Sequence, residues 1–571
     1  MARSLVACLL AFLLHPEVNA LPVPWWRALR SQNYKEDIFK VKPFAESGEV
    51  AKWFCQQKQD HFDPQNSVTW CQRYFVNATF WNRHKGGPVF VCVGGEGPAF
   101  SDDVLYHSNH CNDMTELAPQ VGALLFAVEH RFYGYSIPNV SDLSTRNLDR
   151  FLSSQQAAAD LASFHAFARK EYKICPMAKW VTFGGSYPGM LASYARLLYP
   201  DLFHAAVASS APVQAAVDFP GYLDVVAEAL AVANYEVGGS AACLAAVSQG
   251  HDAIGRLLKT GEGKRDLERR FELCGDKPLD IEANIALWVG FGVIPVDAQS
   301  NAPECDTPLC NIAKVCQAVL DAVEIGDGDP LYALEEVARQ ARISDGLTCT
   351  DVDFAASMDE MKDTSLTNWI RVWTFQTCKE FGFYQTCADG SNCPFTKGYN
   401  TLAFNVDQCQ ELFDISPQQV ARNVEATSKF YGGDRPNSTR VLWVNGQIDP
   451  WHYLSVLVSP GHKLPTIWVP GDSHHYWTHP SLPSNTAYDR EAREAIWDYV
   501  KAWLGDNAGV ASHKQRHQHS SVASSFLARP VVVSSQRDVS EEIGLLQVEA
   551  SPRGDGVARD GFSSAEGTNE L

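Results

Sequence analysis

The sequence has little positive charge for its size. Its 571 residues include 47 Lys and Arg against 67 Asp and Glu, a formal net charge of −20. A nucleic-acid binder needs a basic face to attract phosphate, so this balance excludes that class of protein. With 45% hydrophobic and 20% charged residues the chain can build a folded core. Its length predicts one large domain with an insertion, or two domains.

Long apolar runs are also missing, except near the N-terminus. Residues 5–14 are apolar, but they are fewer than the roughly 20 needed to cross a bilayer. Small residues follow at Val18 and Ala20. This pattern predicts a secretory signal peptide over 1–20 and no membrane span. We therefore expect the protein in the secretory pathway, either outside the cell or in a lysosomal or vacuolar lumen.

The closely spaced cysteine pairs of zinc sites are absent. Cys305, Cys310 and Cys316 are separated by four and five residues, whereas zinc sites favour Cys-x2-Cys spacing. We predict no metal and no cofactor. Removal of Cys8 with the signal peptide would leave an odd number from the original 16 cysteines. Most should form disulfides, and at least one should stay free or pair between chains.

Three sequons for N-glycosylation occur in this expected secretory chain. They begin at Asn77, Asn139 and Asn437. A glycan at each site is the corresponding prediction.

Short apolar runs predict buried strands of a parallel sheet. They cover 88–93, 123–128, 180–183, 204–208, 440–445 and 466–469. Helical spacing of apolar residues predicts helices at 152–172, 190–198 and 489–504. The strand, helix and strand between 180 and 208 form a βαβ unit, which implies parallel strands.

The helix-rich segment 213–419 contains ten cysteines and separates the two groups of strands. We interpret it as a helical insertion stapled by disulfides into a split domain. After residue 505 the chain has no Trp or Cys and is rich in Ser, Arg, His and Gly, which predicts a disordered tail. The expected divisions are 1–20 signal peptide, 21–212 first part of the core, 213–419 insertion, 420–505 second part of the core and 506–571 tail.

The turn Gly184-Gly-Ser186 lies between a predicted strand and a predicted helix. This is the placement of a nucleophile elbow, in which a sharp turn exposes the serine hydroxyl. The match to Gly-x-Ser-x-Gly is incomplete, because Pro188 occupies the second position after the serine. Ser186 is nevertheless the expected nucleophile if a base and a carboxylate accompany it.

The required partners follow Ser186 in the appropriate order. A serine hydroxyl needs a base, and the base needs an orienting carboxylate. In α/β-hydrolases the order along the chain is Ser, Asp or Glu, then His. Asp449 follows the predicted strand ending at 445, and both His474 and His475 follow the strand ending at 469. The pattern thus predicts a catalytic triad with either histidine as the base.

Several longer motifs occur in one order along the chain. They lie at 60–63, 70–74, 129–134, 154–160, 184–189, 371–386 and 445–451. The motif at 371–386 begins Arg371-x-Trp-x-x-Gln376-x-Cys-x-Glu380, and the motif at 445–451 reads Asn445-Gly-x-x-Asp449-Pro-Trp451. Together these motifs resemble the lysosomal Pro-Xaa carboxypeptidase family of serine peptidases, which also includes dipeptidyl peptidase II and the thymus-specific serine protease. The resemblance covers about 50–505.

The resemblance implies an α/β fold, namely an α/β-hydrolase core with a helical cap. It also implies Ser186 as nucleophile, Asp449 as orienting carboxylate and His474, rather than His475, as base. The backbone N–H groups of Tyr187 and Gly95 are the oxyanion donors implied by such a site.

The same resemblance implies peptide substrates and cleavage after proline near a chain end. An exopeptidase needs a charged group for that end: Glu96 and Glu380 are candidates for binding an amino terminus, and Arg131 and Arg371 for binding a carboxyl terminus. Carboxypeptidase and dipeptidyl peptidase modes both stay open. The alternatives are an endopeptidase of the same family without proline specificity, and a secreted esterase or lipase. A homodimer is a possible assembly.

Overall fold

The protein is described by a computed structural model over residues 51–107, 109–234, 237–459, 461 and 463–505. In this part of the chain an eight-stranded sheet has the order β1-β2-β4-β3-β5-β6-β9-β10. β2 pairs antiparallel with β1 and β4, and every later pair is parallel. The strands are β1 (Lys52–Lys58), β2 (Thr69–Asn77), β3 (Val89–Val93), β4 (Leu124–Val128), β5 (Trp180–Gly185), β6 (Ala205–Ser209), β9 (Val441–Gly446) and β10 (Thr466–Val469).

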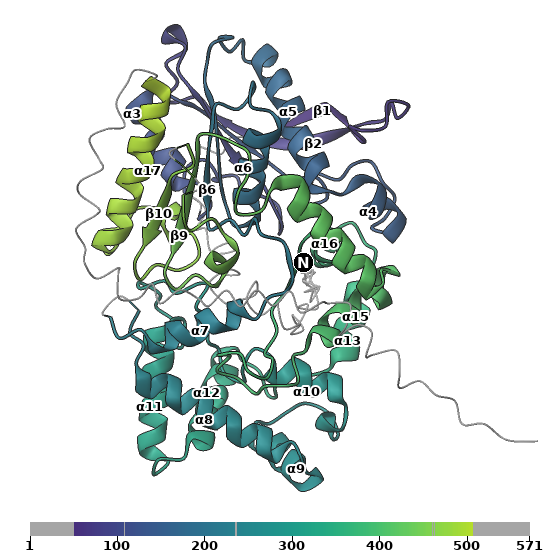
Figure 1. The fold of residues 1–571 in the computed structure, drawn as a ribbon, viewed down its shortest axis with the longest axis vertical. Coiled ribbons are helices and arrows are strands. Elements are labelled where there is room, and N and C mark those ends of the chain that lie inside the picture. The colour runs from purple at the N-terminus through teal and green to yellow at the C-terminus, as the bar shows by residue number, and fades with distance from the viewer. Residues whose placement is uncertain (1–50, 108, 235–236, 460, 462, 506–571) are drawn as a thin grey trace, which may run out of the picture. The chain divides into compact units, whose positions relative to one another are not determined.

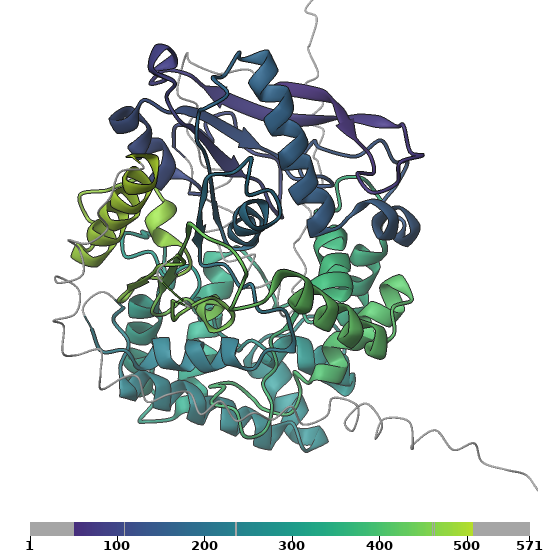
Figure 2. The same cartoon turned by 45° about the horizontal axis from the view of Figure 1, so that its top comes forward.

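Helices cover both faces of this sheet (Figures 1 and 2). α5 (Ser154–Glu171) and α6 (Tyr187–Leu198) pack on one face, and α3 (Asn112–Val121) and α17 (Ala487–Gly505) pack on the other. The strands have two buried faces because alternate residues serve different cores: Val91 contacts the first cluster and Phe90 the second. This explains why their sequences are continuous apolar runs. A short helix, α4 (Thr145–Phe151), precedes α5.

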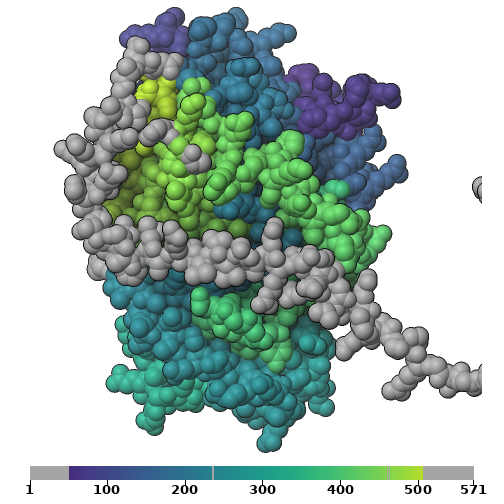
Figure 3. Space-filling model, in the orientation of Figure 1, coloured from purple at the N-terminus to yellow at the C-terminus, as the bar shows by residue number. Residues whose placement is uncertain are grey.

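A large insertion separates β6 from β9, and its teal residues form much of the lower surface in Figure 3. Its elements are β7 (Ala216–Asp218), α7 (Gly221–Ala231), α8 (Ala241–Leu257), α9 (Gly261–Arg270), α10 (Glu282–Val289), α11 (Ile312–Ile325), α12 (Pro330–Ser344), α13 (Phe354–Lys362), α14 (Trp369–Gln376), the π-helical turn η3 (Thr377–Phe381), β8 (Gly382–Tyr384), α15 (Leu402–Phe413) and α16 (Pro417–Tyr431). The remaining short turns are η1 (Arg83–Lys85), η2 (Pro278–Asp280), η4 (Pro450–Leu454) and η5 (Tyr476–Thr478).

Disulfides hold the insertion together. Five of the seven found among the described residues lie within it: Cys243–Cys316, Cys274–Cys349, Cys305–Cys310, Cys378–Cys409 and Cys387–Cys393. The other two, Cys55–Cys71 and Cys92–Cys111, lie in the sheet domain. Cys175 is free and exposed. The expectation of mostly paired cysteines with one left over is therefore confirmed for this part of the chain.

The fold prediction is confirmed: the protein has an α/β-hydrolase core with an inserted, disulfide-stapled helical cap. The predicted strands and helices all occur, with ends shifted by a few residues. Position 419, where the insertion was predicted to end, lies inside α16. A capping box between Ser416 and Gln419 starts that helix, which continues to Tyr431. The predicted signal peptide and tail lie outside the described residues.

Two pairs of strands were not predicted. β1 and β2 have mixed polar and apolar residues, and their pairing is supported by Cys55–Cys71. β7 and β8 contain three residues each and form a small parallel sheet within the cap. In the described parts of the chain, no helix has the length and apolar character to cross a membrane.

Candidate active site

Ser186 occupies a strained turn between β5 and α6. Its φ of 62° and ψ of −134° are unfavourable for a residue with a Cβ atom, so the surrounding packing must hold them. A Cβ added to Gly184 would lie 2.3 Å from the carbonyl oxygen of Pro188. Only glycine permits this close approach of strand and helix. The turn has the geometry of a nucleophile elbow despite Pro188 in the motif.

Asp449 and His474 lie together although 25 residues separate them. Asp449 follows β9 and is fully buried, and His474 follows β10. The Oδ1 atom of Asp449 is 2.8 Å from Nδ1 of His474 and also accepts a hydrogen bond of 2.9 Å from the backbone N–H of Trp451. A carboxylate partner places the imidazole proton on Nδ1. Nε2 of His474 is then an acceptor, and it has no partner among the described residues.

His475 is held in a different environment. Its backbone N–H donates to Ser210 Oγ at 2.8 Å, and its Nδ1 lies 3.2 Å from Thr478 Oγ1. Its ring packs on Gly185, where an added Cβ would be 2.7 Å from the ring carbon Cγ. Burial and the nearby His474 hold the pKa of His475 well below its ordinary value. Of the two histidines, it is His474 that the structure pairs with Asp449.

Gln299 supports this arrangement from the cap and was missed in the sequence. Its carbonyl oxygen accepts the backbone N–H of His474 at 3.1 Å. Its side-chain Oε1 accepts from Trp451 Nε1 at 2.9 Å and from Tyr222 OH at 3.0 Å. Gln299 thus fixes the cap against the Asp449 and His474 loops. It belongs to no motif, and its partners are distant in the chain, so no signal in the sequence pointed to it.

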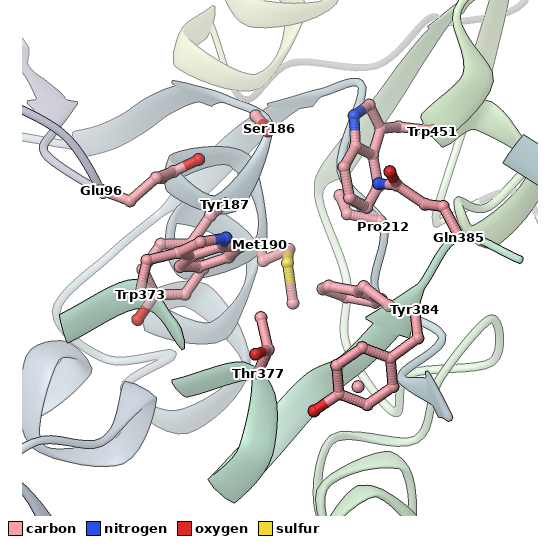
Figure 4. Close-up of a pocket in the computed structure, with 12 residues that line it drawn as sticks. Glu96, Ser186, Tyr187, Met190, Pro212, Trp373, Thr377, Tyr384, Gln385 and Trp451 are labelled. Atoms are coloured by element: carbon pink, nitrogen blue, oxygen red, sulfur yellow. The ribbon is translucent and has the colours of Figure 1, made fainter. Parts of the chain in front are cut away.

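A pocket with about 510 Å³ of empty space, part of it open to solvent, begins at Ser186 (Figure 4). Its lining residues are Glu96, Ser186, Tyr187, Met190, Pro212, Trp373, Thr377, Gly382, Phe383, Tyr384, Gln385 and Trp451. Core and cap both contribute to this wall. Aromatic rings and Met190 make it mainly apolar, which suits an apolar side chain or a proline ring.

Glu96 is the one acidic or basic side chain in that lining. Figure 4 shows it on the opposite side of Ser186 from Trp451. Its Oε2 atom is buried and has no hydrogen-bond partner within the described chain. Burial raises the pKa of the Glu96 carboxyl to about 8. Below that pH the group is neutral and can donate a hydrogen bond into the pocket.

The other three side chains predicted to bind a chain end do not line the pocket. Arg131 is fully buried and forms two 2.7 Å contacts with the carboxylate of Asp160. Arg371 donates to the backbone carbonyls of Leu143 and Met361 at 2.8 and 2.9 Å. Glu380 is buried and accepts hydrogen bonds from Ser154. All three have structural partners in place of a substrate terminus.

The expected oxyanion donors lie beside the nucleophile turn. Tyr187 is the first residue of α6, and the first N–H groups of a helix have no acceptor within the helix. Gly95 follows β3 and packs on the start of α6, where an added Cβ would be 2.4 Å from Cγ of Pro188. Tyr187 thus directly follows Ser186, and Gly95 lies against Pro188, two residues beyond it.

The predicted glycosylation sites differ in accessibility. Asn139 and Asn437 are exposed. Asn77 is only 2% exposed, and its Oδ1 accepts the backbone N–H of Thr79 at 2.9 Å. A glycan on the Asn77 side chain conflicts with this burial. As for metal binding, the described residues contain no group of three or more His, Cys, Asp or Glu side chains arranged to hold an ion.

Comparison with known proteins identifies the family of this chain. Residues 57–496 match the family described as serine carboxypeptidase S28. Thymus-specific serine protease from Mus musculus is 36% identical over 79% of this chain and 87% of its own length. The human counterpart is 35% identical over 79% and 86%. Human lysosomal Pro-X carboxypeptidase is 27% identical over 88% and 98%. The chain belongs to the serine carboxypeptidase S28 family and is a serine-type peptidase.

Proposed function

We propose that this peptidase acts through Ser186, His474 and Asp449. The observation that carries the proposal is the hydrogen bond of 2.8 Å between His474 Nδ1 and Asp449 Oδ1, which leaves Nε2 of His474 as the acceptor. The strained turn supplies the nucleophile, Ser186. These are the roles of base, orienting carboxylate and nucleophile in a serine hydrolase.

In the first half of the reaction, Ser186 Oγ attacks the carbonyl carbon of the peptide bond as His474 Nε2 accepts the hydroxyl proton. The negative charge that develops on the carbonyl oxygen is stabilised by the N–H groups of Tyr187 and Gly95. His474 then gives its proton to the leaving amine, and the C–N bond breaks. An acyl-enzyme on Ser186 remains, and Asp449 stays ionised throughout.

In the second half, water attacks the acyl-enzyme and transfers a proton to His474. The imidazolium returns that proton to Ser186 Oγ as the ester bond breaks. The products are the free acid and the original enzyme.

The pocket supports cleavage after proline. The pocket that contains Ser186 has an apolar wall formed by Trp373, Phe383 and Trp451. A proline ring is rigid and apolar, so it can fill such a pocket with little loss of conformational freedom. The name of one relative, lysosomal Pro-X carboxypeptidase, agrees with this specificity.

We further propose that the enzyme is a carboxypeptidase and that Glu96 recognises the terminal carboxylate. From the negative charge of an ionised carboxylate alone, Glu96 was expected to bind an amino terminus. Burial changes that expectation, because a carboxyl group with a pKa of about 8 is neutral in acid. The neutral group donates a hydrogen bond to a carboxylate, and its orphaned buried oxygen has no competing partner in the described chain.

A peptide panel tests this mode. An N-blocked peptide with Pro before its last residue should be cleaved at pH 5, and amidation of its carboxyl terminus should lower kcat/KM about 10-fold or more. Glu96→Gln keeps a neutral donor and should retain most activity at pH 5, whereas Glu96→Leu should lose it. A free-amine Xaa-Pro reporter that is cleaved faster than the blocked peptide, with its rate lost in Glu96→Gln, would instead establish a dipeptidyl peptidase.

We place the enzyme in the secretory pathway or a lysosomal lumen. The seven disulfides found in the described chain suit an oxidising compartment. Exposed sequons at Asn139 and Asn437 are compatible with passage through it. Immunofluorescence of the full chain with a lysosomal marker tests the location, and a cytosolic distribution would contradict it.

A further inference from the structure

The segment Gln376-x-Cys-x-Glu380 stood out in the sequence, yet neither Gln376 nor Glu380 lines the pocket. Both lie where α14 passes into the π-helical turn η3. α14, η3 and the following strand β8 supply Trp373, Thr377 and Phe383, respectively, to the pocket wall. π-Helical turns are uncommon and occur frequently at functional sites. The buried polar pair therefore lies directly behind the substrate wall.

Gln376 is joined by hydrogen bonds to the residue after the nucleophile. Its Nε2 donates to the Tyr187 hydroxyl at 2.9 Å, and that hydroxyl lies 2.9 Å from His130 Nε2. His130 Nδ1 is 2.6 Å from the carbonyl oxygen of Arg131. Because a carbonyl only accepts, Nδ1 carries the imidazole proton, and the Tyr187 hydroxyl must donate to Nε2. Burial lowers the pKa of His130 to about 4, which keeps the ring neutral.

The other side of the Gln376 amide is also fixed. Its Oε1 accepts from Tyr133 OH at 2.6 Å, and Nε2 is 3.2 Å from Glu380 Oε2. The amide thus has one consistent orientation, because the Tyr187 hydroxyl already donates its proton to His130 and can only accept from an N–H of Gln376. Each donor and acceptor in this buried group has a partner, which rigidifies such a network.

Glu380 anchors the network to the core. The backbone N–H and the hydroxyl of Ser154, the first residue of α5, donate to its Oε1 at 2.9 and 2.6 Å. A carboxylate is stabilised at the amino end of a helix. The Tyr431 hydroxyl at the end of α16 lies 2.9 Å from Ser154 Oγ. Cap and core are therefore locked together behind the nucleophile turn.

We propose that Gln376 is a positioning residue for catalysis: through the Tyr187 hydroxyl it holds the oxyanion-binding N–H of Tyr187 in register with the cap wall of the substrate pocket. This inference rests on the oxyanion role given to Tyr187 in the proposed function. Ser186 itself is in a strained conformation that depends on its surroundings. Anchoring the adjacent Tyr187 side chain supplies that support. A misplacement of about 1 Å at a reacting centre lowers rates by about 100-fold.

The test is a double-mutant cycle of Gln376→Leu and Tyr187→Phe, measured as kcat and KM on the N-blocked peptide. Each single change should lower kcat about 10- to 100-fold and alter KM less. Because Gln376 acts through the Tyr187 hydroxyl, Gln376→Leu should lower kcat less than about 3-fold further in the Tyr187→Phe enzyme. A full, multiplicative loss in the double variant would overturn the proposal.

Gln57→Leu is the matched control. Gln57 is a fully buried glutamine that donates to Gln72 and to the carbonyl oxygen of Asp160, away from the pocket lining. The Gln57→Leu substitution should lower the melting temperature but leave kcat within about 2-fold of the wild type. Equal loss of kcat in Gln57→Leu and Gln376→Leu would contradict a positioning role.

Two further measurements keep the test decisive. If Gln376→Leu does not fold, the smaller change Tyr187→Phe alone should still reduce kcat about 10-fold, and an unchanged kcat overturns the proposal. Failure of the proposed function is a separate result, because it would appear as peptidase activity retained by Ser186→Ala.

Discussion

His474 Nδ1 lies 2.8 Å from Asp449 Oδ1, and this contact joins the loops that follow two neighbouring parallel strands, β9 and β10. The carboxylate also accepts a hydrogen bond from the backbone N–H of Trp451, and this second bond fixes its orientation toward the imidazole. The pair explains how a fully buried Asp449 serves the site: it sets the tautomer of His474 and offsets the charge that the ring acquires during the reaction.

Asp449→Asn tests that role. An amide in place of the carboxylate favours the wrong imidazole tautomer, so kcat should fall about 10⁴-fold while the fold is kept. The measurement is kcat on the N-blocked peptide, with circular dichroism to verify folding. A folded variant with less than about 10-fold loss would show that Asp449 is not the orienting carboxylate.

The adjacent histidines form a matched pair of variants. His474→Gln removes the proposed base and should lower kcat at least about 1,000-fold. His475→Gln leaves the contact of His474 with Asp449 in place, so its kcat per folded molecule should stay much closer to the wild type. Both rates are normalised to folded enzyme, because His474 is buried and the His475 ring packs on Gly185. The opposite ranking would assign the base to His475.

The raised pKa of Glu96 should make the free energy of unfolding depend on pH. Its folded pKa of about 8 is above the ordinary value of 4.5. Between these values the folded state holds a proton that the unfolded state has lost, so the contribution of Glu96 to stability falls as pH rises through this window.

The comparison of wild type with Glu96→Gln isolates this effect, since the variant cannot titrate at that position. The melting temperature of the wild type should fall relative to the variant between pH 4.5 and 8. Differential scanning calorimetry at pH 5 and pH 8.5 measures the difference, and a pH-independent gap would contradict the raised pKa.

Each cap disulfide should stabilise the fold by an amount that increases with the length of the loop that it closes. Cys243–Cys316 spans 73 residues and Cys305–Cys310 spans 5. Replacing both cysteines of a pair by alanine should lower the free energy of unfolding. Loop entropy predicts a decrease of about 4 kcal/mol for the first pair and about 2 kcal/mol for the second. Urea unfolding of the two double variants measures both decreases. A larger decrease on removal of Cys305–Cys310 than on removal of Cys243–Cys316 would contradict the prediction.

Much of the sheet domain could be predicted from sequence. Strands such as β3 and β5 are buried on both faces and therefore appear as short apolar runs. The nucleophile turn was visible because close packing requires glycine at position 184. β1 and β2 were missed because both contain many polar residues, and because β1 lies at the edge of the sheet.

The substrate-binding candidates were harder to judge because side-chain pairing is not encoded by charge alone. Arg131 and Asp160 meet only after folding, and Glu380 reaches the start of α5 from the cap across 226 residues of sequence. Gln299 meets His474 and Trp451 in the same way. Residue type gave the possible chemistry of each group, but burial and long-range partners determined its role.

The most direct test of the account is the position of the adduct formed by a fluorophosphonate, which reacts with an activated serine. The native full-length enzyme should be labelled at Ser186, as located by mass spectrometry of its peptides, and labelling and peptidase activity should disappear together in Ser186→Ala. Labelling of a different residue, or peptidase activity retained by Ser186→Ala, would contradict the proposed mechanism.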